Sequence, residues 1–454
     1  MLESGDLNRT SRRKFLKLAA GTGIAGVATA AGVYRVTRFS SGAKGKIVII
    51  GGGAAGLSMA ALLQRWLDAP DITVIDPSDT HYYQPGFTLI ASGIYTPDEV
   101  WKAQKACIPS KAKWIRDSVV EVKPSANQVV TKANGAVPYD FLVLAPGLQI
   151  NWEGVEGMTQ ATLGQGNAHC IYDFVGAQKA WAAIQEFAKR GGRGIFTDTY
   201  TKHKCGGAPK KICLLTDDHS RRQKTRDHLT LSYCTAAKEL YDVPHYTPRL
   251  EAIYRERDIP VHLNTRVKGV DVSAKRVHME RRETVDGKTV ATPFAEDYDF
   301  LHFTPPMSAP DFVRASGLSW TEGKLAAEGW AMTDKETLIH KAYPSIVCLG
   351  DCAGIPTSKT SAAIRRQVPV AAMNLVALME GKAPEAKYDG YAACPIITDY
   401  GHVILCEFDY DKKPRQSAVF APFDMSKEQA VAWHLKTKVL KALYFQGMLR
   451  GYGF

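Results

Sequence analysis

The chain has 454 residues, 45% of them hydrophobic, and a formal net charge of +11 at pH 7. Its length allows more than one domain, and no run of about 20 strongly apolar residues follows the N-terminal region, which excludes a bundle of membrane-spanning helices. Lysine and arginine outnumber aspartate and glutamate by 57 to 46, and the pI of about 9.0 favours an anionic partner. Because no nucleic-acid motif accompanies this charge, we expect a membrane surface and no nucleic acid.

The N-terminus carries a basic segment followed by a mildly apolar one. Residues 11–17 read Ser-Arg-Arg-Lys-Phe-Leu-Lys, and residues 18–30 are rich in glycine and alanine and end in Ala-Thr-Ala. This is the pattern of a twin-arginine export signal, which serves proteins exported folded with a bound cofactor. We therefore expect residues 1–44 to be signal and linker. The expected location is the periplasmic face of a bacterial inner membrane, with the signal either cleaved or kept as an anchor.

A glycine fingerprint follows the first apolar strand of the chain. Residues 47–50 read Ile-Val-Ile-Ile, which is typical of a buried parallel strand. The residues with G-x-G-x-x-G spacing that follow are Gly51, Gly53, Ala54, Ala55 and Gly56. This spacing predicts a tight turn into a helix whose N-terminus faces a pyrophosphate. A second strand, 72–75, ends at Asp76, which is placed to bind a ribose 2′-hydroxyl and favours FAD or NAD over NADP.

Two later strands distinguish FAD from NAD. The first, at 139–144, ends in an Ala-Pro-Gly turn, and the second, at 345–349, ends in Gly-Asp. Both endings resemble later signatures of the two-dinucleotide flavoproteins, where the first usually reads Ala-Thr-Gly and the aspartate holds the ribityl chain. The residues of these endings expected at the cofactor are Ala145, Gly147, Gly350 and Asp351. We therefore expect FAD.

The middle of the chain has no second phosphate-binding turn. An expected strand at 193–199 runs into residues 200–205, and no further G-x-G-x-x-G follows it. An enzyme reduced by NAD(P)H would need that turn, so the electron donor is expected to be different. The loop instead brings Cys205, while Cys394 lies far away in sequence. Since a flavin accepts two electrons from a thiol pair, these cysteines predict sulfur redox chemistry.

Residues 45–454 resemble the sulfide:quinone oxidoreductases of the mitochondrial type. The matching segments are 82–89, 204–212, 303–310, 350–352, 356–360, 394–395 and 407–410. The resemblance implies that Cys205 bonds to the flavin and that Cys394 carries the sulfane sulfur. It also implies hydrogen sulfide as substrate, ubiquinone or another membrane quinone as electron acceptor, and sulfite, a thiol or sulfide as sulfur acceptor. Further FAD-binding residues implied in the same way are Gln84, Val119, Lys359, Thr360, Ser361, Ala362, Ala363 and Ile364.

Three lysines lie close to Cys205 in sequence, and they are Lys204, Lys210 and Lys211. They supply positive charge that favours the thiolate, or they belong to a solvated loop, and the sequence leaves both interpretations open. Most of the other cysteines are interpreted as small buried side chains. Cys170 is a candidate for a third catalytic or relay cysteine, as in some bacterial members, whereas Cys352 is not expected to be catalytic. No Cys/His ligand spacing occurs, so no metal site is expected.

The C-terminal residues predict a basic amphipathic helix. Ser426 and Gln429 form a capping-box pattern before it. A broad apolar face is expected to hold Trp433, Val439, Leu440, Leu443, Tyr444 and Met448. The lysines expected mostly off this face are Lys436, Lys438 and Lys441. Such a helix can lie in the headgroup layer and open a route for quinone, and packing on the protein's own core is the alternative.

The expected fold is α/β, with two Rossmann-like dinucleotide-binding domains and a C-terminal membrane-associating helical segment. The expected boundaries are 45–160 and 296–390 for the two halves of the FAD domain, 161–295 for the second domain, and 391–454 for the quinone and membrane region. Three other functions stay open: the flavin subunit of a flavocytochrome c sulfide dehydrogenase, a type II NADH:quinone oxidoreductase, and a non-catalytic flavin or sulfide sensor.

Overall fold

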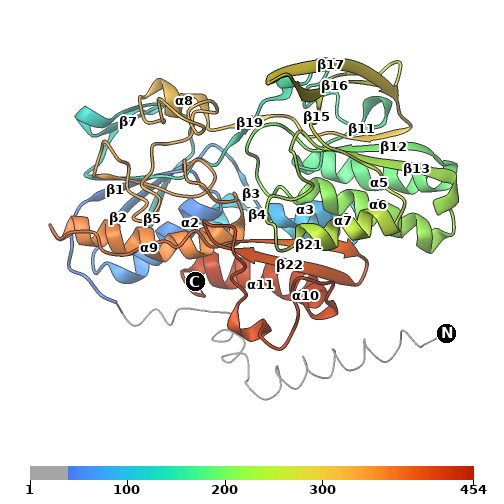
Figure 1. The fold of residues 1–454 in the computed structure, drawn as a ribbon. Coiled ribbons are helices and arrows are strands. Elements are labelled where there is room, and N and C mark those ends of the chain that lie inside the picture. The colour runs from blue at the N-terminus through green and yellow to red at the C-terminus, as the bar shows by residue number, and fades with distance from the viewer. Residues whose placement is uncertain (1–38, 454) are drawn as a thin grey trace.

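The structure is a computed structural model that describes residues 39–453. The export signal expected at residues 11–30 lies outside the described residues. Within the described part, no helix is long and apolar enough to cross a membrane. Figure 1 shows two sheet-containing lobes side by side, with the C-terminal part of the chain running beneath both.

A five-stranded parallel sheet forms the first lobe. Its strands, in spatial order, are β20 (Ile346–Cys348), β9 (Phe141–Leu144), β1 (Lys46–Ile50), β2 (Asp71–Ile75) and β5 (Ala112–Ile115). The helices α2 (Ala54–Trp66) and α9 (Ser361–Met379) pack against each other in the same lobe. Because parallel sheets are usually covered on both faces, a central strand such as β1 is an unbroken apolar run, and residues 47–50 are all buried.

A second five-stranded parallel sheet forms the other lobe. Its strands, in spatial order, are β11 (Ala168–His169), β18 (Phe300–His302), β12 (Gly192–Thr197), β13 (Leu229–Cys234) and β14 (Val261–His262). The helices of this lobe are α5 (Phe174–Arg190), α6 (Ala208–Gln223) and α7 (Thr247–Glu256). The expected α/β fold is therefore confirmed. Strand β18, from the stretch 296–390, completes this second sheet, and β12 leads directly into the loop that carries Cys205.

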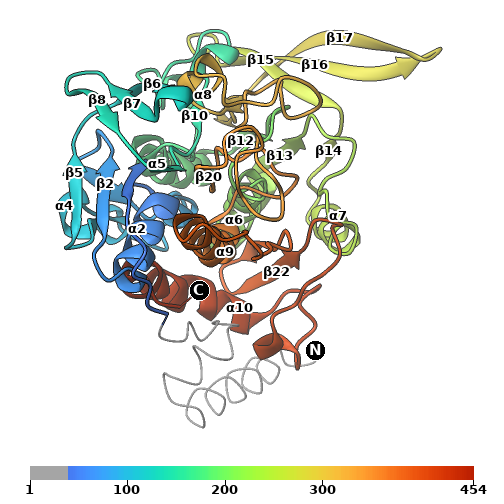
Figure 2. The same cartoon turned by 90° about the vertical axis from the view of Figure 1, so that its left-hand side faces the viewer.

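Short elements surround the two sheets. The antiparallel groups are β3 (Thr80–Tyr82) with β4 (Trp101–Ala103), β6 (Val119–Lys123) with β7 (Gln128–Thr131) and β8 (Gly135–Pro138), β10 (Gln149–Ile150) with β19 (Met307–Ser308), and β15 (Thr265–Asp271) with β16 (Arg276–Val285) and β17 (Lys288–Asp297). The short helices are α3 (Phe87–Ile90), α4 (Gln104–Cys107) and α8 (Asp311–Ala315). Figure 2 shows β16 and β17 as a ribbon that projects from the body.

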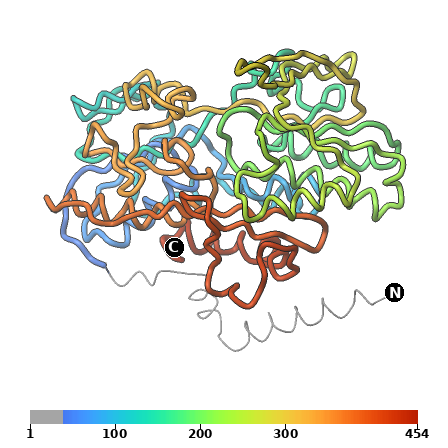
Figure 3. The backbone as a smooth tube through the Cα atoms, in the orientation of Figure 1, coloured from blue at the N-terminus to red at the C-terminus, as the bar shows by residue number. Residues whose placement is uncertain are grey.

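The C-terminal part begins with a hairpin and ends in irregular helix. The hairpin consists of β21 (Ala392–Asp399) and β22 (His402–Phe408), and the helical elements are α10 (Ala430–His434), a π-helical turn (Leu435–Val439), α11 (Leu440–Ala442) and a second π-helical turn (Leu443–Gly447). The tube in Figure 3 follows this part, in red, beneath both lobes. Strand β21 packs on α6, so the C-terminal part contacts the helix that follows Cys205.

The C-terminal helix differs from the regular amphipathic helix that the sequence predicts. It begins at Ala430, and the Ser426 hydroxyl donates to Asp424 instead of capping the helix, so the predicted capping box is wrong. Each π-helical turn shifts the angular position of the side chains that follow it. As a result Lys436, expected off the apolar face, is buried, whereas Leu443 is 37% exposed.

A buried carboxylate ties the second lobe to the C-terminal hairpin. Asp217 on α6 has no exposed side-chain surface, and it accepts hydrogen bonds from Arg221 and Arg226 at 2.9 and 2.6 Å. Arg257 lies 3.4 Å from the same carboxylate and also donates to the Thr398 carbonyl oxygen of β21 over 2.7 Å. The carboxylate therefore orients Arg257, whose guanidinium group reaches β21.

Replacement of this carboxylate should be costly. In Asp217→Asn the mostly buried Arg226 and Arg257 lose their counter-charge, and we expect the free energy of unfolding to fall by about 3 kcal/mol in a urea titration. The matched control is Asp297→Asn, which breaks an exposed pair with Arg276 and should cost less than about 1 kcal/mol. Equal losses in the two variants would contradict this role for Asp217.

Candidate functional site

The glycine turn after β1 forms a cradle for a dinucleotide. Gly51 has a φ of +102°, and a Cβ on it would lie 2.2 Å from the Ala145 carbonyl oxygen. A Cβ on Gly56 would lie 1.9 Å from the Gly51 carbonyl oxygen, which excludes larger residues at both positions. Gly53, the N-cap residue of α2, faces open space, with no atom within 4 Å of an added Cβ. The turn and the free first amides of α2 therefore fit a pyrophosphate.

An acidic residue stands where the ribose of this dinucleotide would lie. Asp76 follows β2, and its carboxylate accepts hydrogen bonds from the Gly52 and Ser78 amides at 2.6 and 2.8 Å. Burial raises the pKa of Asp76 above its ordinary value, although these two amides lower it in part. The carboxylate is thus fixed against the glycine turn, as the sequence predicts for a residue that binds a ribose hydroxyl.

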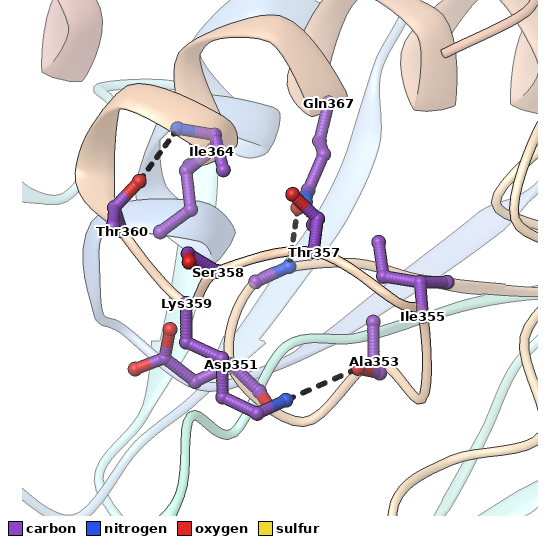
Figure 4. A pocket seen from close by; sticks show the side chains of 11 residues that line it. Asp351, Ala353, Ile355, Thr357, Ser358, Lys359, Thr360, Ile364 and Gln367 are labelled. Carbon is purple, nitrogen blue, oxygen red and sulfur yellow. Dashed lines mark hydrogen bonds between the residues drawn. The ribbon is translucent and has the colours of Figure 1, made fainter. Parts of the chain in front are cut away.

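A small pocket opens at the N-terminus of α9, beside the end of β20. Figure 4 shows Asp351 and Lys359 on the loop side of the pocket and Thr360 and Ile364 at the start of the helix. The Thr360 hydroxyl accepts a hydrogen bond from the Ala363 amide over 3.1 Å, so it caps α9. Burial raises the pKa of Asp351. The polar groups at this helix N-terminus and the glycine cradle fit separate parts of FAD.

Cys205 is attached to this pocket through its backbone. Its amide donates to the Lys359 carbonyl oxygen over 2.9 Å, and residues 204 and 359 form an isolated parallel bridge. Cys205 has a φ of +48°, in the left-handed region that costs about 1 kcal/mol or more for a residue with a side chain. The Tyr172 hydroxyl also donates to the Cys205 carbonyl oxygen, at 3.1 Å. The loop is therefore held in an unfavourable backbone conformation next to the pocket at the N-terminus of α9.

The two cysteines predicted from the sequence meet in the structure. Cys394 lies on β21 and is buried, and its Sγ atom is 3.6 Å from the Cys205 Sγ atom. A Cβ on Gly207 would lie 2.5 Å from the Cys394 sulfur, so only glycine allows this approach. Both cysteines are free thiols in this structure. The pair brings the loop after β12 next to a strand whose cysteine follows 189 residues later in the sequence.

The pair is electrostatically asymmetric. The hydrogen bond from the Cys394 thiol, and then the Lys211 ammonium 3.2 Å from the Cys205 sulfur, lower the pKa of Cys205 well below its usual value despite burial. The same hydrogen bond, together with burial, raises the pKa of Cys394 well above its usual value. Cys205 is thus the thiolate of the pair, and Cys394 is its thiol partner.

The other lysines of the predicted cluster have different partners. Lys204 donates to the Gln84 side-chain oxygen at 2.7 Å, and Lys210 is buried in an ion pair with Asp198 at 3.2 Å. Sequence reasoning missed Lys436, which burial and then the charge of Lys211 leave with a pKa lowered to about 7. A regular 3.6-residue period placed Lys436 on the polar side of the helix, and the π-helical turn that buries it leaves no recognisable signal in the sequence.

Several other predicted residues lie near the pocket or away from it. Gln84 is exposed and reaches the pocket only through Lys204, and Val119 begins β6. Cys170 is fully buried after β11, and burial raises its pKa to about 12, which makes its thiolate scarce at neutral pH. Cys352 donates to the Leu144 carbonyl oxygen at 3.2 Å. Among the described residues no cluster suited to a metal ion occurs.

The fold and the site together define a flavoprotein that exchanges electrons with a thiol pair. In agreement, residues 45–181 match the family model described as pyridine nucleotide-disulphide oxidoreductase. Over 407 residues the chain is 34% identical to the mitochondrial sulfide:quinone oxidoreductase of Mus musculus, with 90% of this chain and 87% of the mouse protein covered. The same enzyme of Dictyostelium discoideum is 37% identical over 410 residues, with the same coverage.

The X-ray structure of the sulfide:quinone oxidoreductase from Aquifex aeolicus has the same fold, with a TM-score of 0.71, 20% identity, and 90% and 92% of the two chains covered. The chain belongs to the sulfide:quinone oxidoreductase family. It oxidises sulfide with FAD and passes the electrons to a quinone. The flavocytochrome, NADH:quinone and sensor alternatives are not favoured.

The location expected from the N-terminal residues is wrong. The relatives from Mus musculus and Dictyostelium discoideum are both named as mitochondrial enzymes, which contradicts the periplasmic face of a bacterial membrane. The basic and apolar pattern on which that expectation depended lies among residues 1–38, outside the described structure.

The charge asymmetry of the thiol pair predicts a pH dependence. In Lys211→Met the ammonium beside Cys205 is lost, so the pKa of Cys205 should rise and its thiolate should form only at higher pH. Alkylation of Cys205 by iodoacetamide, located by peptide mass spectrometry, should slow by about tenfold or more at pH 7. The control is Lys204→Met, whose ammonium contacts Gln84 instead. An unchanged alkylation profile in Lys211→Met would disprove the assignment.

Proposed function

We propose that Cys205 and Cys394 form the sulfur relay of this sulfide:quinone oxidoreductase. The observation that carries the proposal is the 3.6 Å between their sulfur atoms. This distance is too long for a disulfide, whose S–S bond is about 2.05 Å, but it is shorter than two such bonds end to end, about 4.1 Å. One additional sulfur atom therefore fits between the two cysteines without movement of the backbone.

The division of labour follows from the pKa asymmetry. Hydrosulfide attacks the Cys394 sulfur and breaks its bond to the bridging sulfur atom. The added sulfur stays on Cys394 as a persulfide, and Cys205 leaves as a persulfide anion that keeps the bridging sulfur. Lys211 stabilises the anion on Cys205, and the hydrogen bond to the Lys359 carbonyl holds that residue beside the pocket at α9. FAD, when bound, accepts two electrons and transfers them to the quinone. The persulfide sulfur then passes to a nucleophilic acceptor, for which we propose sulfite, a thiol or sulfide.

For the cofactor, we propose that the pyrophosphate of FAD lies on the glycine turn of 51–56 and that Asp76 binds its ribose. The residues proposed to line the remainder of FAD are Ala145, Gly147, Gly350, Asp351, Lys359, Thr360, Ser361, Ala362, Ala363 and Ile364. The open space at Gly53 and the small pocket at the N-terminus of α9 support this assignment. We keep Gln84 and Val119 as predicted contacts.

Each cysteine of the relay should be indispensable. Cys205→Ser and Cys394→Ser should each lower sulfide-dependent quinone reduction more than about 100-fold, because residues that act as a unit fail together. FAD should stay bound, since neither thiol lies in the glycine cradle, and flavin absorbance measures this directly. Cys352→Ser is the matched control and should keep most activity. Substantial sulfide turnover by either relay variant would refute the mechanism, and a comparable loss in Cys170→Ser would reveal a third reacting cysteine.

We also propose that the C-terminal segment 430–450 docks on a membrane surface. Its outward side carries the exposed Leu443 and the half-buried Val439 and Leu440. The exposed Lys438 directly precedes Val439. Apolar side chains with adjacent ammonium groups favour the headgroup layer of an anionic membrane. The inward side of the same segment carries Lys436, close to the thiol pair, so docking would bring the quinone near the redox centre.

Membrane docking can be measured by sedimentation with vesicles of phosphatidylcholine and phosphatidylglycerol. Replacing both leucines, Leu440→Asp and Leu443→Asp together, removes apolar surface worth about 1.5 kcal/mol or more, so vesicle binding should weaken at least about tenfold. The control is Val290→Asp on the projecting ribbon, which is similarly exposed and should bind as the parent protein does. Equal binding by both variants would exclude this segment as the docking surface.

A further inference from the structure

The C-terminal segment forms several hydrogen bonds with the first lobe. Among them are those of Lys436 with the Pro85 carbonyl (2.9 Å), Thr437 with the Tyr95 hydroxyl (2.8 Å), Lys441 with Glu99 (2.5 Å) and Tyr444 with His81 (2.7 Å). Three of these contacts end at the stretch 85–99. The fourth, through His81, continues into the glycine turn that the sequence assigns to FAD.

His81 connects the C-terminal tyrosine to the backbone of that turn. It is only 3% exposed, its Nδ1 atom lies 3.1 Å from the Gly52 carbonyl oxygen, and its Nε2 atom lies 2.7 Å from the Tyr444 hydroxyl. A carbonyl oxygen can only accept, so Nδ1 carries the proton and Nε2 accepts from Tyr444. Burial also lowers the pKa of His81, which favours this neutral tautomer.

Gly52 is fixed on both sides of its peptide unit. Its amide donates to Asp76 over 2.6 Å, and its carbonyl oxygen accepts a second hydrogen bond, from Gln104, at 2.9 Å. A Cβ on Gly52 would lie 1.9 Å from the Gln104 nitrogen and 3.0 Å from the Asp76 Cβ, so the packing leaves no room for adjustment. The chain of contacts therefore runs from Tyr444 through His81 and Gly52 to the carboxylate that faces the ribose.

Tyr444 is inserted into the first lobe, whereas the residue that precedes it is exposed. Tyr444 is 5% exposed, and its ring centroid lies 5.8 Å from that of His81 and 5.0 Å from that of Tyr83. The preceding Leu443 is 37% exposed. The π-helical turn Leu443–Gly447 thus turns Tyr444 and the adjacent Phe445 inward, and of these two Tyr444 is the one whose hydroxyl bonds to His81 and so reaches the glycine turn.

We propose that Tyr444 and His81 are positioning residues for FAD, through which the C-terminal segment holds the glycine turn in its FAD-binding conformation. Loss of the Tyr444 hydroxyl leaves the buried His81 Nε2 atom without its donor, and an unsatisfied buried acceptor is costly. The strain is transmitted to Gly52 because the same imidazole donates to its carbonyl. This inference rests on the proposed assignment of the glycine turn to FAD, but it does not depend on the roles of the cysteines or on membrane docking.

The test is FAD release from the holoenzyme, followed as the rise of flavin fluorescence after dilution, with the dissociation constant from titration. In Tyr444→Phe the ring stays and only the hydroxyl is lost, and we expect FAD to bind about tenfold more weakly. Tyr452→Phe is the matched control, because this exposed tyrosine lies two residues beyond the segment and contacts Arg65 instead of His81. It should retain FAD as the parent protein does. Equal FAD affinity in the parent protein and in Tyr444→Phe would overturn the proposal.

A double-mutant cycle separates the relay from general loosening of the lobe. If Tyr444 acts through His81, the combination of Tyr444→Phe with His81→Asn should bind FAD no more weakly than His81→Asn alone. Additive losses would overturn the relay. Gly56→Ala tests the underlying assignment, because its Cβ would collide with the Gly51 carbonyl oxygen. Undiminished FAD binding in Gly56→Ala would show that the assignment of the turn has failed, independently of the relay.

Discussion

The hydrogen bond from the Cys205 amide to the Lys359 carbonyl oxygen, 2.9 Å long, is the contact on which the redox site depends. It joins the loop after β12, in the second lobe, to the segment that leads into α9, in the first. Without it the thiolate would have no fixed place relative to the FAD pocket. The left-handed backbone of Cys205 indicates that surrounding contacts, including those of Tyr172 and Gly207, impose this conformation on the loop.

Buried ammonium groups give the site its electrostatic character. Burial alone would lower the pKa of Lys211, but the neighbouring sulfurs of Cys205 and Cys394 raise it, so this lysine stays charged beside the thiolate. Lys436 faces the same pair without a carboxylate of its own, and its pKa falls to about 7. The pKa values of these two buried lysines thus shift in opposite directions. Lys211 touches the Cys205 sulfur, whereas the pKa of Lys436 is lowered first by burial and then by the charge of Lys211.

The C-terminal segment has an inner and an outer side of different character because its helix is irregular. A straight α-helix with the same sequence would present one continuous apolar stripe. The two π-helical turns divide that stripe, so that Lys436 and Tyr444 point inward and Leu443 points outward. The inner side of this segment therefore holds Lys436, whose pKa responds to the thiol pair, and Tyr444, which reaches the glycine turn through His81. Its outer side exposes Leu443.

The sequence by itself determined the features that are local in the chain. The glycine spacing of 51–56, Asp76 at the end of β2 and the apolar strands required no tertiary information, because backbone geometry ties each of them to a turn or a strand end. The absence of a second glycine motif after the strand at 193–199 was also evident from the sequence. The separate roles of Cys205 and Cys394 came only from the resemblance. Their 3.6 Å approach, the choice of Lys211 over Lys204 and Lys210, and the burial of Lys436 were decided by the packing of α6, β21 and the π-helical turns. Such contacts join residues far apart in sequence, and no period or spacing along the chain encodes them.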